Sequence, residues 1–254
     1  MKHARREVSL SEEELGTFLR RKTRRDFLIA GVAAAGGIGA YEWMKSNEGD
    51  DGTPKLERRV LDLNGELSKA YLNNSRLMPS YSEAQVRPLK PNGNIGLHAP
   101  IEQEWRLKVI TRFAPALTLS LSDVQALPKI DMITRFCCIE GWSTIVHWGG
   151  ARLSDFTQKY FPPRERIPNY VYMATPDEEY YVGLDTKSAM HPQTLLAYEY
   201  NGKPLTTEHG APLRLVIPVK YGIKNIKRIG SIKFTDEKPS DYWADEGYDW
   251  FAGL

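Results

Sequence analysis

The chain has 254 residues, of which 41% are hydrophobic and 11% aromatic, and this is ample material for one large core. Its formal net charge is +2, but residues 1–25 contain eight Lys or Arg and four Glu, so the rest of the chain sums to −2. A globular part so close to neutral lacks the basic surface that nucleic-acid binding requires. The two cysteines, Cys137 and Cys138, are adjacent and exclude a disulfide framework.

The N-terminal segment, residues 1–45, is predicted to be a leader. Arg24 and Arg25 precede Phe27, and a charge-free stretch then runs to Ala40, which resembles a twin-arginine export signal. That stretch has 14 residues, fewer than the ~20 that span a bilayer, so export is favoured over a transmembrane anchor. The expected partner is the twin-arginine translocation machinery, which carries folded proteins, often with a cofactor already inserted. We therefore expect a periplasmic or otherwise exported protein, with the leader either cleaved or kept as a membrane tether.

A polar linker, residues 46–55, and a domain over residues 56–254 are predicted to follow. Apolar residues at the start of the domain recur at the spacing of an amphipathic helix, namely Leu56, Val60, Leu63, Leu67 and Tyr71. Residues 79–103 have no periodicity and predict a long surface or functional loop. The later pattern predicts strands at residues 105–110, 117–121, 143–148, 170–174, 180–184, 214–219 and 231–234, helices at 122–127 and 154–161, and partly helical structure over 186–196. This order indicates an α+β fold without a regular βαβ repeat.

The most informative motif is Cys138-Ile139-Glu140-Gly141-Trp142, which directly follows Cys137. A cysteine in an apolar stretch is more often a small buried residue than a ligand. The motif, however, resembles the cysteine motif of the sulfite-oxidase superfamily, in particular the branch of periplasmic catalytic subunits related to methionine-sulfoxide reductase. The resemblance implies that the Cys138 thiolate binds the metal of a molybdenum-molybdopterin cofactor. A soft thiolate suits a metal that dithiolene sulfurs already hold.

A second block, residues 209–227, resembles the pterin-binding half of the same superfamily. The resemblance implies cofactor-binding roles for five of its residues: His209, Arg214, Asn225, Ile226 and Lys227. Molybdopterin ends in a phosphate, which Arg can bind in a bidentate manner and Lys as a point charge. From charge alone, the same residues fit a solvated basic surface equally well.

Further matches extend the resemblance from about residue 70 to the C-terminus. They imply that Asn94 and Thr175 contact the cofactor, with His98 as a second candidate beside Asn94. They also imply that Tyr181 faces the metal as a catalytic residue. From the residues alone, Tyr181 fits a half-buried strand position equally well.

The fold that the resemblance implies is a mixed-sheet, sulfite-oxidase-type molybdopterin-binding domain. Little sequence follows the aromatic residues near the C-terminus, so we expect no C-terminal immunoglobulin-like dimerisation domain and a monomeric protein. The sequence has no Cys-x-x-Cys-His motif for haem attachment. Electrons are therefore expected from a separate partner, either a membrane haem protein or a soluble cytochrome.

Two reactions of the superfamily compete, the oxidation of sulfite and the reduction of an S- or N-oxide. Sulfite oxidases place arginines shortly after the ligating cysteine, whereas Glu140 stands here, and a carboxylate close to the metal repels a doubly charged anion. The sequence thus predicts oxygen-atom transfer with reduction of a neutral or zwitterionic small-molecule substrate, such as a sulfoxide, and a catalytic role for Glu140. Two alternatives stay open, namely sulfite-type oxidation and a non-catalytic exported binding module that lost the metal.

Other classes of enzyme find no support in the sequence. The five histidines lack the close spacing of a zinc site. No Gly-x-Ser-x-Gly elbow and no Gly-x-x-x-x-Gly-Lys phosphate loop is present. The sequence therefore argues against a zinc hydrolase and offers no motif for a serine hydrolase or a nucleotide-binding enzyme.

Overall fold

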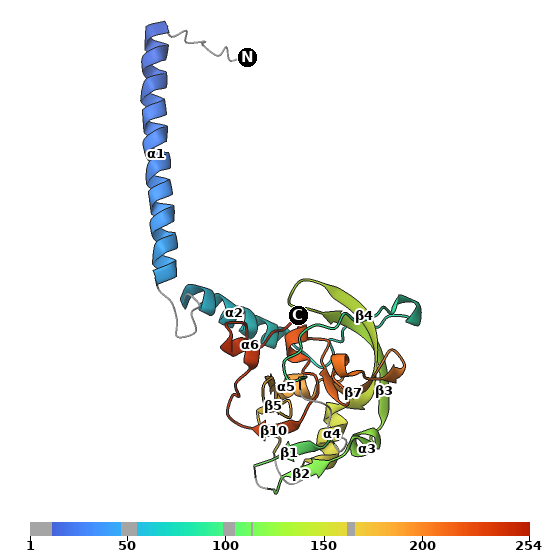
Figure 1. Ribbon diagram of the computed structural model, residues 1–254. Helices are drawn as coiled ribbons and strands as arrows, with labels where there is room; N and C mark the ends of the chain where they lie inside the picture. The colour runs from blue at the N-terminus through green and yellow to red at the C-terminus, as the bar shows by residue number, and fades with distance from the viewer. Residues whose placement is uncertain (1–11, 47–54, 99–104, 113, 162–165) are drawn as a thin grey trace, which may run out of the picture. The chain divides into compact units, whose positions relative to one another are not determined.

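The computed structural model describes residues 12–46, 55–98, 105–112, 114–161 and 166–254 (Figure 1). The chain divides into two compact units, residues 1–58 and 59–254. The first unit contains α1 (Glu12–Ser46), a continuous helix of 35 residues that covers most of the predicted leader. Nearly all of the predicted linker lies outside the described residues. No helix within the described ranges is long and apolar enough to cross a membrane.

The predicted amphipathic helix is confirmed as α2 (Lys55–Tyr71). It continues through Asn64 and Gly65, and Gly65 is its buried residue. A Cβ atom at Gly65 would lie 2.8 Å from Oδ1 of Asp249, so the missing side chain allows the helix to pack closely against the C-terminal segment. The apolar residues of the helix lie on the opposite side and are exposed.

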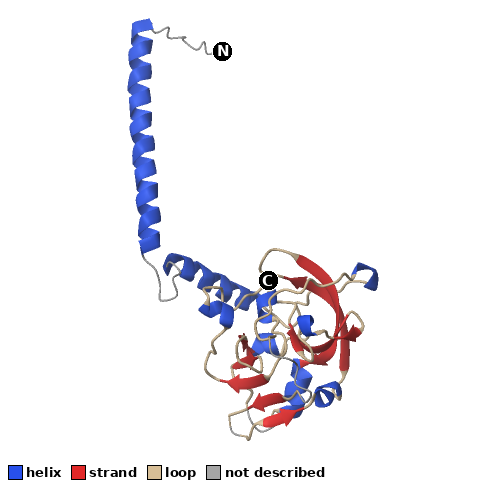
Figure 2. Cartoon of the chain, in the orientation of Figure 1, coloured by secondary structure: helices blue, strands red, loops and turns tan. Residues whose placement is uncertain are grey.

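Two five-stranded sheets form the second unit (Figure 2). The first sheet has the order β2 (Leu117–Leu119), β1 (Leu107–Ile110), β10 (Ser231–Thr235), β5 (Tyr170–Ala174) and β6 (Tyr181–Asp185). The second has the order β3 (Lys129–Cys137), β4 (Ser143–Arg152), β7 (Leu195–Tyr200) and β8 (Lys203–Pro204), with β9 (Arg214–Val216) also paired to β7. β1 and β10 are parallel and the other pairs are antiparallel. The expected mixed-sheet α+β fold is confirmed.

Short helices lie before, between and after the strands in the sequence (Figure 2). The α-helices are α3 (Leu121–Gln125), α4 (Leu153–Tyr160), α5 (Thr186–Ala189) and α6 (Tyr242–Asp245), and the 3-10 helices are η1 (Glu83–Gln85), η2 (Thr207–His209) and η3 (Gly222–Lys224). Ser120 begins α3 with a capping box, in which its hydroxyl accepts from the Asp123 N–H at 3.3 Å and its own N–H donates to Oδ2 of Asp123 at 2.8 Å. Such caps let helices of only one turn form.

The hairpin of β3 and β4 is the longest paired element and carries the cysteine motif at its tip. Nine residue pairs join the strands, from Lys129 with Ala151 to Cys137 with Ser143. The chain reverses over residues 138–142, where the Cys138 N–H donates to the Trp142 carbonyl at 2.9 Å. Gly141 takes a positive φ of 87° in this turn, which a residue without a side chain adopts most easily.

The sequence prediction misses β3, β7 and the two-residue strand β8. Apolar residues at alternate positions of β3, such as Ile130 and Met132, are the signal of a half-buried strand, and the prediction assigned no element to them. Residues 186–196, predicted as partly helical, contain the single turn of α5, and Leu195 already begins β7. Burial of β7 between β4, β8 and β9 overrides the local pattern there.

Candidate active site

A cavity of about 950 Å³, including its open mouth, lies where the tip of the β3–β4 hairpin meets the loop at residues 89–95, β9, η3 and the segment after α6. Six residues of the predicted site line it: Cys138, Glu140, His209, Arg214, Asn225 and Lys227. These residues come from two blocks that lie about 70 positions apart in the sequence. The fold therefore brings both predicted motifs to one cavity.

Cys138 lies in the hairpin turn with a side chain that is only 7% exposed. Its sulfur accepts a hydrogen bond from Nδ2 of Asn92, at a distance of 3.6 Å. Cys137 ends β3, is not among the lining residues, and has a thiol pKa that burial raises. Of the two adjacent cysteines, Cys138 is the one placed to bind a ligand in the cavity.

Glu140 lies on the same turn and is exposed at the cavity. Its Oε2 accepts a hydrogen bond from the indole Nε1 of Trp142 at 2.9 Å. Hydrogen bonds from Trp142 and Asn92, and to a smaller extent the charge of Lys90, lower the pKa of this carboxyl. Glu140 therefore presents a negative charge next to Cys138 at neutral pH.

Arg214 is a fully buried cation in the cavity wall, with 1% of its surface exposed. Its guanidinium donates to the His209 carbonyl at 2.9 Å and the Asn225 carbonyl at 3.1 Å, and it lies 4.8 Å from the ring centroid of Trp148. Burial lowers its pKa to about 10. No carboxylate forms an ion pair with it within the described part of the chain. A buried charge without a counter-ion is costly, so the geometry suits an anion supplied by a ligand.

Lys227 and His209 lie beside Arg214 in the same cavity. The Lys227 ammonium donates to the carbonyls of Asn92 and Gly93 at 2.8 and 2.9 Å, and burial, followed by the charge of Arg214, lowers its pKa to about 8. Nε2 of His209 lies 3.1 Å from the Leu89 carbonyl, which can only accept, so this nitrogen carries the proton. These contacts fix the loop at residues 89–93 over the cavity.

Asn225 and Ile226 make contacts within the chain that stabilise the segment around β9. The Asn225 side chain accepts from the Ile217 N–H at 2.8 Å and donates to the Tyr221 carbonyl at 3.1 Å. Ile226 is buried in the main core, and its carbonyl accepts from the Leu215 N–H at 2.9 Å. Asn225 still lines the cavity, whereas Ile226 does not.

Four other predicted residues are not among those that line the cavity: Asn94, His98, Thr175 and Tyr181. The Thr175 hydroxyl donates to Oδ1 of Asp177 at 2.6 Å, and Thr175 packs directly against Gly96. The Tyr181 hydroxyl donates to Oδ2 of Asp245 at 2.8 Å, and this bond is the first cause that raises its pKa to about 12. Thr175 therefore packs against the loop at Gly96 and not into the cavity, and Tyr181 faces α6.

The neighbours of two of these residues occupy the cavity instead. Tyr180 lines it, with a hydroxyl that donates to the Ile223 carbonyl at 2.5 Å, and burial raises the pKa of that hydroxyl strongly. Asn92 lines it in place of Asn94. Successive side chains of an extended chain point to opposite sides, so the adjacent tyrosines contained the signal without deciding which of them points inward. Asn92 and Asn94 are two positions apart, with Gly93 at a positive φ of 71° between them, so the path of the loop decides between these two residues. Trp243 and Tyr248 of the C-terminal segment also line the cavity, and the sequence prediction did not include them.

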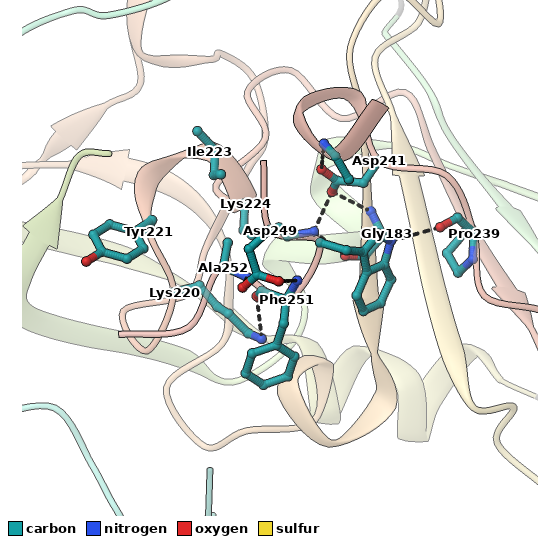
Figure 3. A network of polar contacts seen from close by, with 12 residues as sticks. Gly183, Lys220, Tyr221, Ile223, Lys224, Pro239, Asp241, Asp249, Phe251 and Ala252 are labelled. Atoms are coloured by element: carbon teal, nitrogen blue, oxygen red, sulfur yellow. Dashed lines mark hydrogen bonds and ion pairs between the residues drawn. The ribbon is translucent and has the colours of Figure 1, made fainter. Parts of the chain in front are cut away.

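A buried polar network holds the C-terminal segment behind this wall (Figure 3). Lys224, next to the lining residue Ile223, has its ammonium 2.5 Å from Oδ2 of Asp241 and 2.9 Å from the Gly183 carbonyl. Both side chains of the pair are 1% exposed. Lys220 is 2% exposed, and its ammonium donates to the Phe251 carbonyl at 2.8 Å. The network therefore fixes η3 to β6 and to the start of α6, which carries Trp243.

The family model described as the oxidoreductase molybdopterin binding domain matches residues 96–243, more than half of the chain. The chain therefore belongs to this family and is a molybdopterin-dependent oxidoreductase of the sulfite-oxidase superfamily. The cavity fits such a cofactor, because it combines a cysteine sulfur with a buried, unpaired guanidinium and a second cation.

Similar proteins place the chain within this superfamily. A putative protein-methionine-sulfoxide reductase subunit, YedZ1, from Azospira oryzae is 34% identical over 183 residues, which cover 70% of this chain and 69% of that protein. The protein-methionine-sulfoxide reductase catalytic subunit MsrP of Campylobacter jejuni is 33% identical over 253 residues, which cover 92% of this chain and 81% of that protein. Sequence similarity thus confirms the expected branch.

A solved structure confirms the fold at lower sequence similarity. The sulfane dehydrogenase SoxCD from Paracoccus pantotrophus superposes with a TM-score of 0.50 at 18% identity, over 55% of this chain and 40% of that one. At this identity the likeness concerns the fold alone.

Proposed function

We propose that this enzyme reduces a sulfoxide, with methionine sulfoxide as the model substrate. The observation that carries the proposal is the carboxylate of Glu140, held ionised by Trp142 and Asn92 beside the Cys138 sulfur. A negative charge at this position disfavours a dianion such as sulfite and tolerates a neutral sulfoxide. The names of the relatives, which include protein-methionine-sulfoxide reductase catalytic subunits, support the same substrate class.

We assign the cofactor contacts to the residues that line the cavity. Cys138 would supply the protein thiolate to molybdenum, while Arg214 and Lys227 would bind the pterin phosphate with His209 beside them. When bound, the molybdenum cofactor supplies two-electron oxygen-atom transfer chemistry. The hydrogen bond from Nδ2 of Asn92 would hold the Cys138 sulfur in position for the cofactor.

The chain contributes binding and exclusion of water around the reacting atoms. Trp142, Trp243 and Tyr248 form an aromatic rim that suits the alkyl groups of a thioether oxide. Ile139, 38% exposed at the same mouth, extends the apolar surface. Glu140 stays charged and deters anions, so the rim and the carboxylate together select an uncharged sulfur group.

The test is a comparison of two activities of the molybdenum-loaded enzyme. We expect reduction of methionine sulfoxide with a reduced viologen dye as the electron donor, at a kcat/KM well above that for sulfite oxidation with ferricyanide. A preference for sulfite would overturn the proposal. A chain that carries no molybdenum after production in a cofactor-competent host would favour the non-catalytic binding module.

We further propose that the protein is exported and receives electrons from a separate partner, a membrane haem protein or a soluble cytochrome. The support is the Arg24-Arg25 pair ahead of an apolar stretch and the absence of a haem attachment motif from the sequence. Replacing both arginines, Arg24→Lys and Arg25→Lys, should retain the protein in the cytoplasm. Unchanged export of this variant would exclude the twin-arginine route.

A further inference from the structure

Tyr200, the last residue of β7, holds the loop at residues 89–93 without lining the cavity. Its hydroxyl accepts the N–H of Leu89 at 2.6 Å. Leu89 is 5% exposed and lines the cavity, whereas Tyr200 is not among the lining residues. A backbone N–H buried to this degree needs an acceptor, because leaving it unpaired costs free energy. The Tyr200 hydroxyl therefore gives the loop a fixed attachment at Leu89.

The ring of Tyr200 is itself fixed by two neighbouring rings. It stacks on His209, with ring centroids 4.4 Å apart and 16° between the ring planes, and its centroid lies 5.9 Å from that of Trp148. Trp148 is fully buried, and the partly buried ring of Tyr200 packs against the core cluster that contains both Trp148 and Leu89. A ring packed in this way has little rotational freedom, so its hydroxyl is preorganised to bind Leu89.

Leu89 is held at both of its backbone polar groups. Nε2 of His209 donates to the Leu89 carbonyl at 3.1 Å, while the Tyr200 hydroxyl accepts the Leu89 N–H. Because Nε2 carries the proton, Nδ1 of His209 accepts from the Thr206 hydroxyl, which lies 2.7 Å away. The two stacked rings thus fix both polar groups, and the Leu89 backbone cannot turn without breaking a hydrogen bond.

The attachment at Leu89 is close enough to Asn92 to control its position. Three residue steps separate the two, so their Cα atoms lie within about 11 Å of each other. Pro91 stands in this segment, and its ring restricts the backbone φ angle. Nδ2 of Asn92 donates to the Cys138 sulfur at 3.6 Å. A displacement at Leu89 would therefore move the amide that binds the sulfur.

Lys227 also holds the loop, but its ammonium has a second task. It donates to the carbonyls of Asn92 and Gly93 at 2.8 and 2.9 Å, and it lines the cavity, where we assign it to the pterin phosphate. A phosphate is a stronger acceptor for an ammonium than a neutral carbonyl. The Tyr200 hydroxyl, which lies outside the lining, meets no such competition, so it can hold the loop with or without the cofactor.

We propose that Tyr200 is a positioning residue of this enzyme: through Leu89 and the loop, its hydroxyl holds the Asn92 amide at the Cys138 sulfur. The inference rests on the proposed role of Cys138 as the protein ligand to molybdenum. Hydrogen bonds to a metal ligand orient that ligand and tune the metal. Loss of the Tyr200 hydroxyl should therefore alter the surroundings of the sulfur and leave the residues of the cavity lining unchanged.

The experiment measures the reactivity of Cys138 in the full, cofactor-free chain. Tyr200→Phe keeps the stacked ring and removes the acceptor of the Leu89 N–H. We expect iodoacetamide at one fixed pH to alkylate Cys138 about fivefold faster in this variant, the factor typical of one lost hydrogen bond, with the modified residue localised by mass spectrometry. Cys137 is the internal reference, because it ends β3, lies outside the cavity lining and should react at an unchanged rate.

The matched control is Tyr198→Phe, which removes a hydroxyl from the same strand at a residue of the main core cluster. It should leave the Cys138 rate within about twofold of the wild type. In the molybdenum-loaded enzyme, Tyr200→Phe should shift the absorption band of the sulfur–molybdenum bond and lower kcat, while the molybdenum content stays unchanged. Alkylation needs neither cofactor nor substrate, so a failure of the sulfoxide assay would count against the proposed function alone.

Three results would overturn the proposal. An unchanged Cys138 rate in Tyr200→Phe would show that the loop keeps its position without the hydroxyl. An equal rise at Cys137 and Cys138 would mean that the substitution loosens the tip of the hairpin as a whole. An equal rise in Tyr198→Phe would assign the effect to the strand and not to the contact with Leu89.

Discussion

Replacing Asp241 by Asn removes one charge from the buried pair with Lys224 and preserves the shape of the side chain. Asn can still accept the N–H of Ala244, which Asp241 bonds at 3.2 Å to begin α6. The Lys224 ammonium, however, is 1% exposed and loses the carboxylate at 2.5 Å. Removal of one partner from a buried ion pair typically costs about 3–5 kcal/mol of unfolding free energy.

Loss of the Lys224 proton sets an upper limit on the unfolding free energy that Asp241→Asn can remove. Burial already lowers the pKa of Lys224, with Asp241 as the main group that opposes the shift. Without Asp241 the lysine can instead lose its proton on folding, which costs about 4.6 kcal/mol at pH 7 and about 1.9 kcal/mol at pH 9. The unfolded chain then binds one proton more than the folded one, so the stability of Asp241→Asn should rise with pH relative to the wild type.

The assay is urea unfolding of the cofactor-free protein at pH 7 and pH 9, followed by tryptophan fluorescence. We expect the unfolding free energy of Asp241→Asn to lie about 3–5 kcal/mol below that of the wild type at pH 7, and about 2 kcal/mol below it at pH 9. The matched control is Glu246→Gln, an exposed position at the end of α6, which should change stability by less than about 0.5 kcal/mol. A deficit below about 1 kcal/mol, or one that is no smaller at pH 9, would refute the assigned role of the pair.

Three further predictions concern the cavity and its support. Cys138→Ser should abolish turnover while the far-ultraviolet circular dichroism stays unchanged, and retained activity would contradict the assignment of the metal ligand. Glu140→Gln should raise the ratio of sulfite oxidation to sulfoxide reduction with little change in molybdenum content, and equal losses of cofactor and activity would argue against a substrate-side role. Lys227, whose pKa falls from 10.5 to about 8 on folding, should make the cofactor-free protein more stable as the pH rises through this interval. In the same titration, the unfolding free energy of Lys227→Met should rise less with pH than that of the wild type. An identical rise in unfolding free energy would mean that Lys227 is solvated.

The sequence predicted those parts of the fold and site that depend on local pattern. The spacing of Leu63 and Leu67 is a property of one short segment, and it predicted α2 correctly. The motif around Cys138 and the block that contains Arg214 and Lys227 pointed to residues that the fold brings to one cavity. Each of these signals lies within one short segment of the sequence.

Only the tertiary structure decided which of two neighbouring residues faces the cavity. Tyr180 and Tyr181 are adjacent, and the contacts with Ile223 and Asp245, both distant in sequence, determine that Tyr180 points inward. The choice of Asn92 over Asn94 depends on the path of the loop, which brings Asn92 to the Cys138 sulfur. A shift of one residue reverses the side of a strand, so local pattern cannot choose between the two tyrosines.

The orientation of α2 and the buried pair of Lys224 with Asp241 also depend on the packing of separate segments. An amphipathic pattern indicates that a helix has an apolar face, but the close contact at Gly65 determines that this face points to solvent. Lys224 and Asp241 are each ordinary surface residues by composition, and only the folding of the C-terminal segment over η3 buries them together. Local sequence determines which element a segment forms and on which side its apolar residues lie. Contacts between distant segments determine which of its side chains are buried and which face solvent.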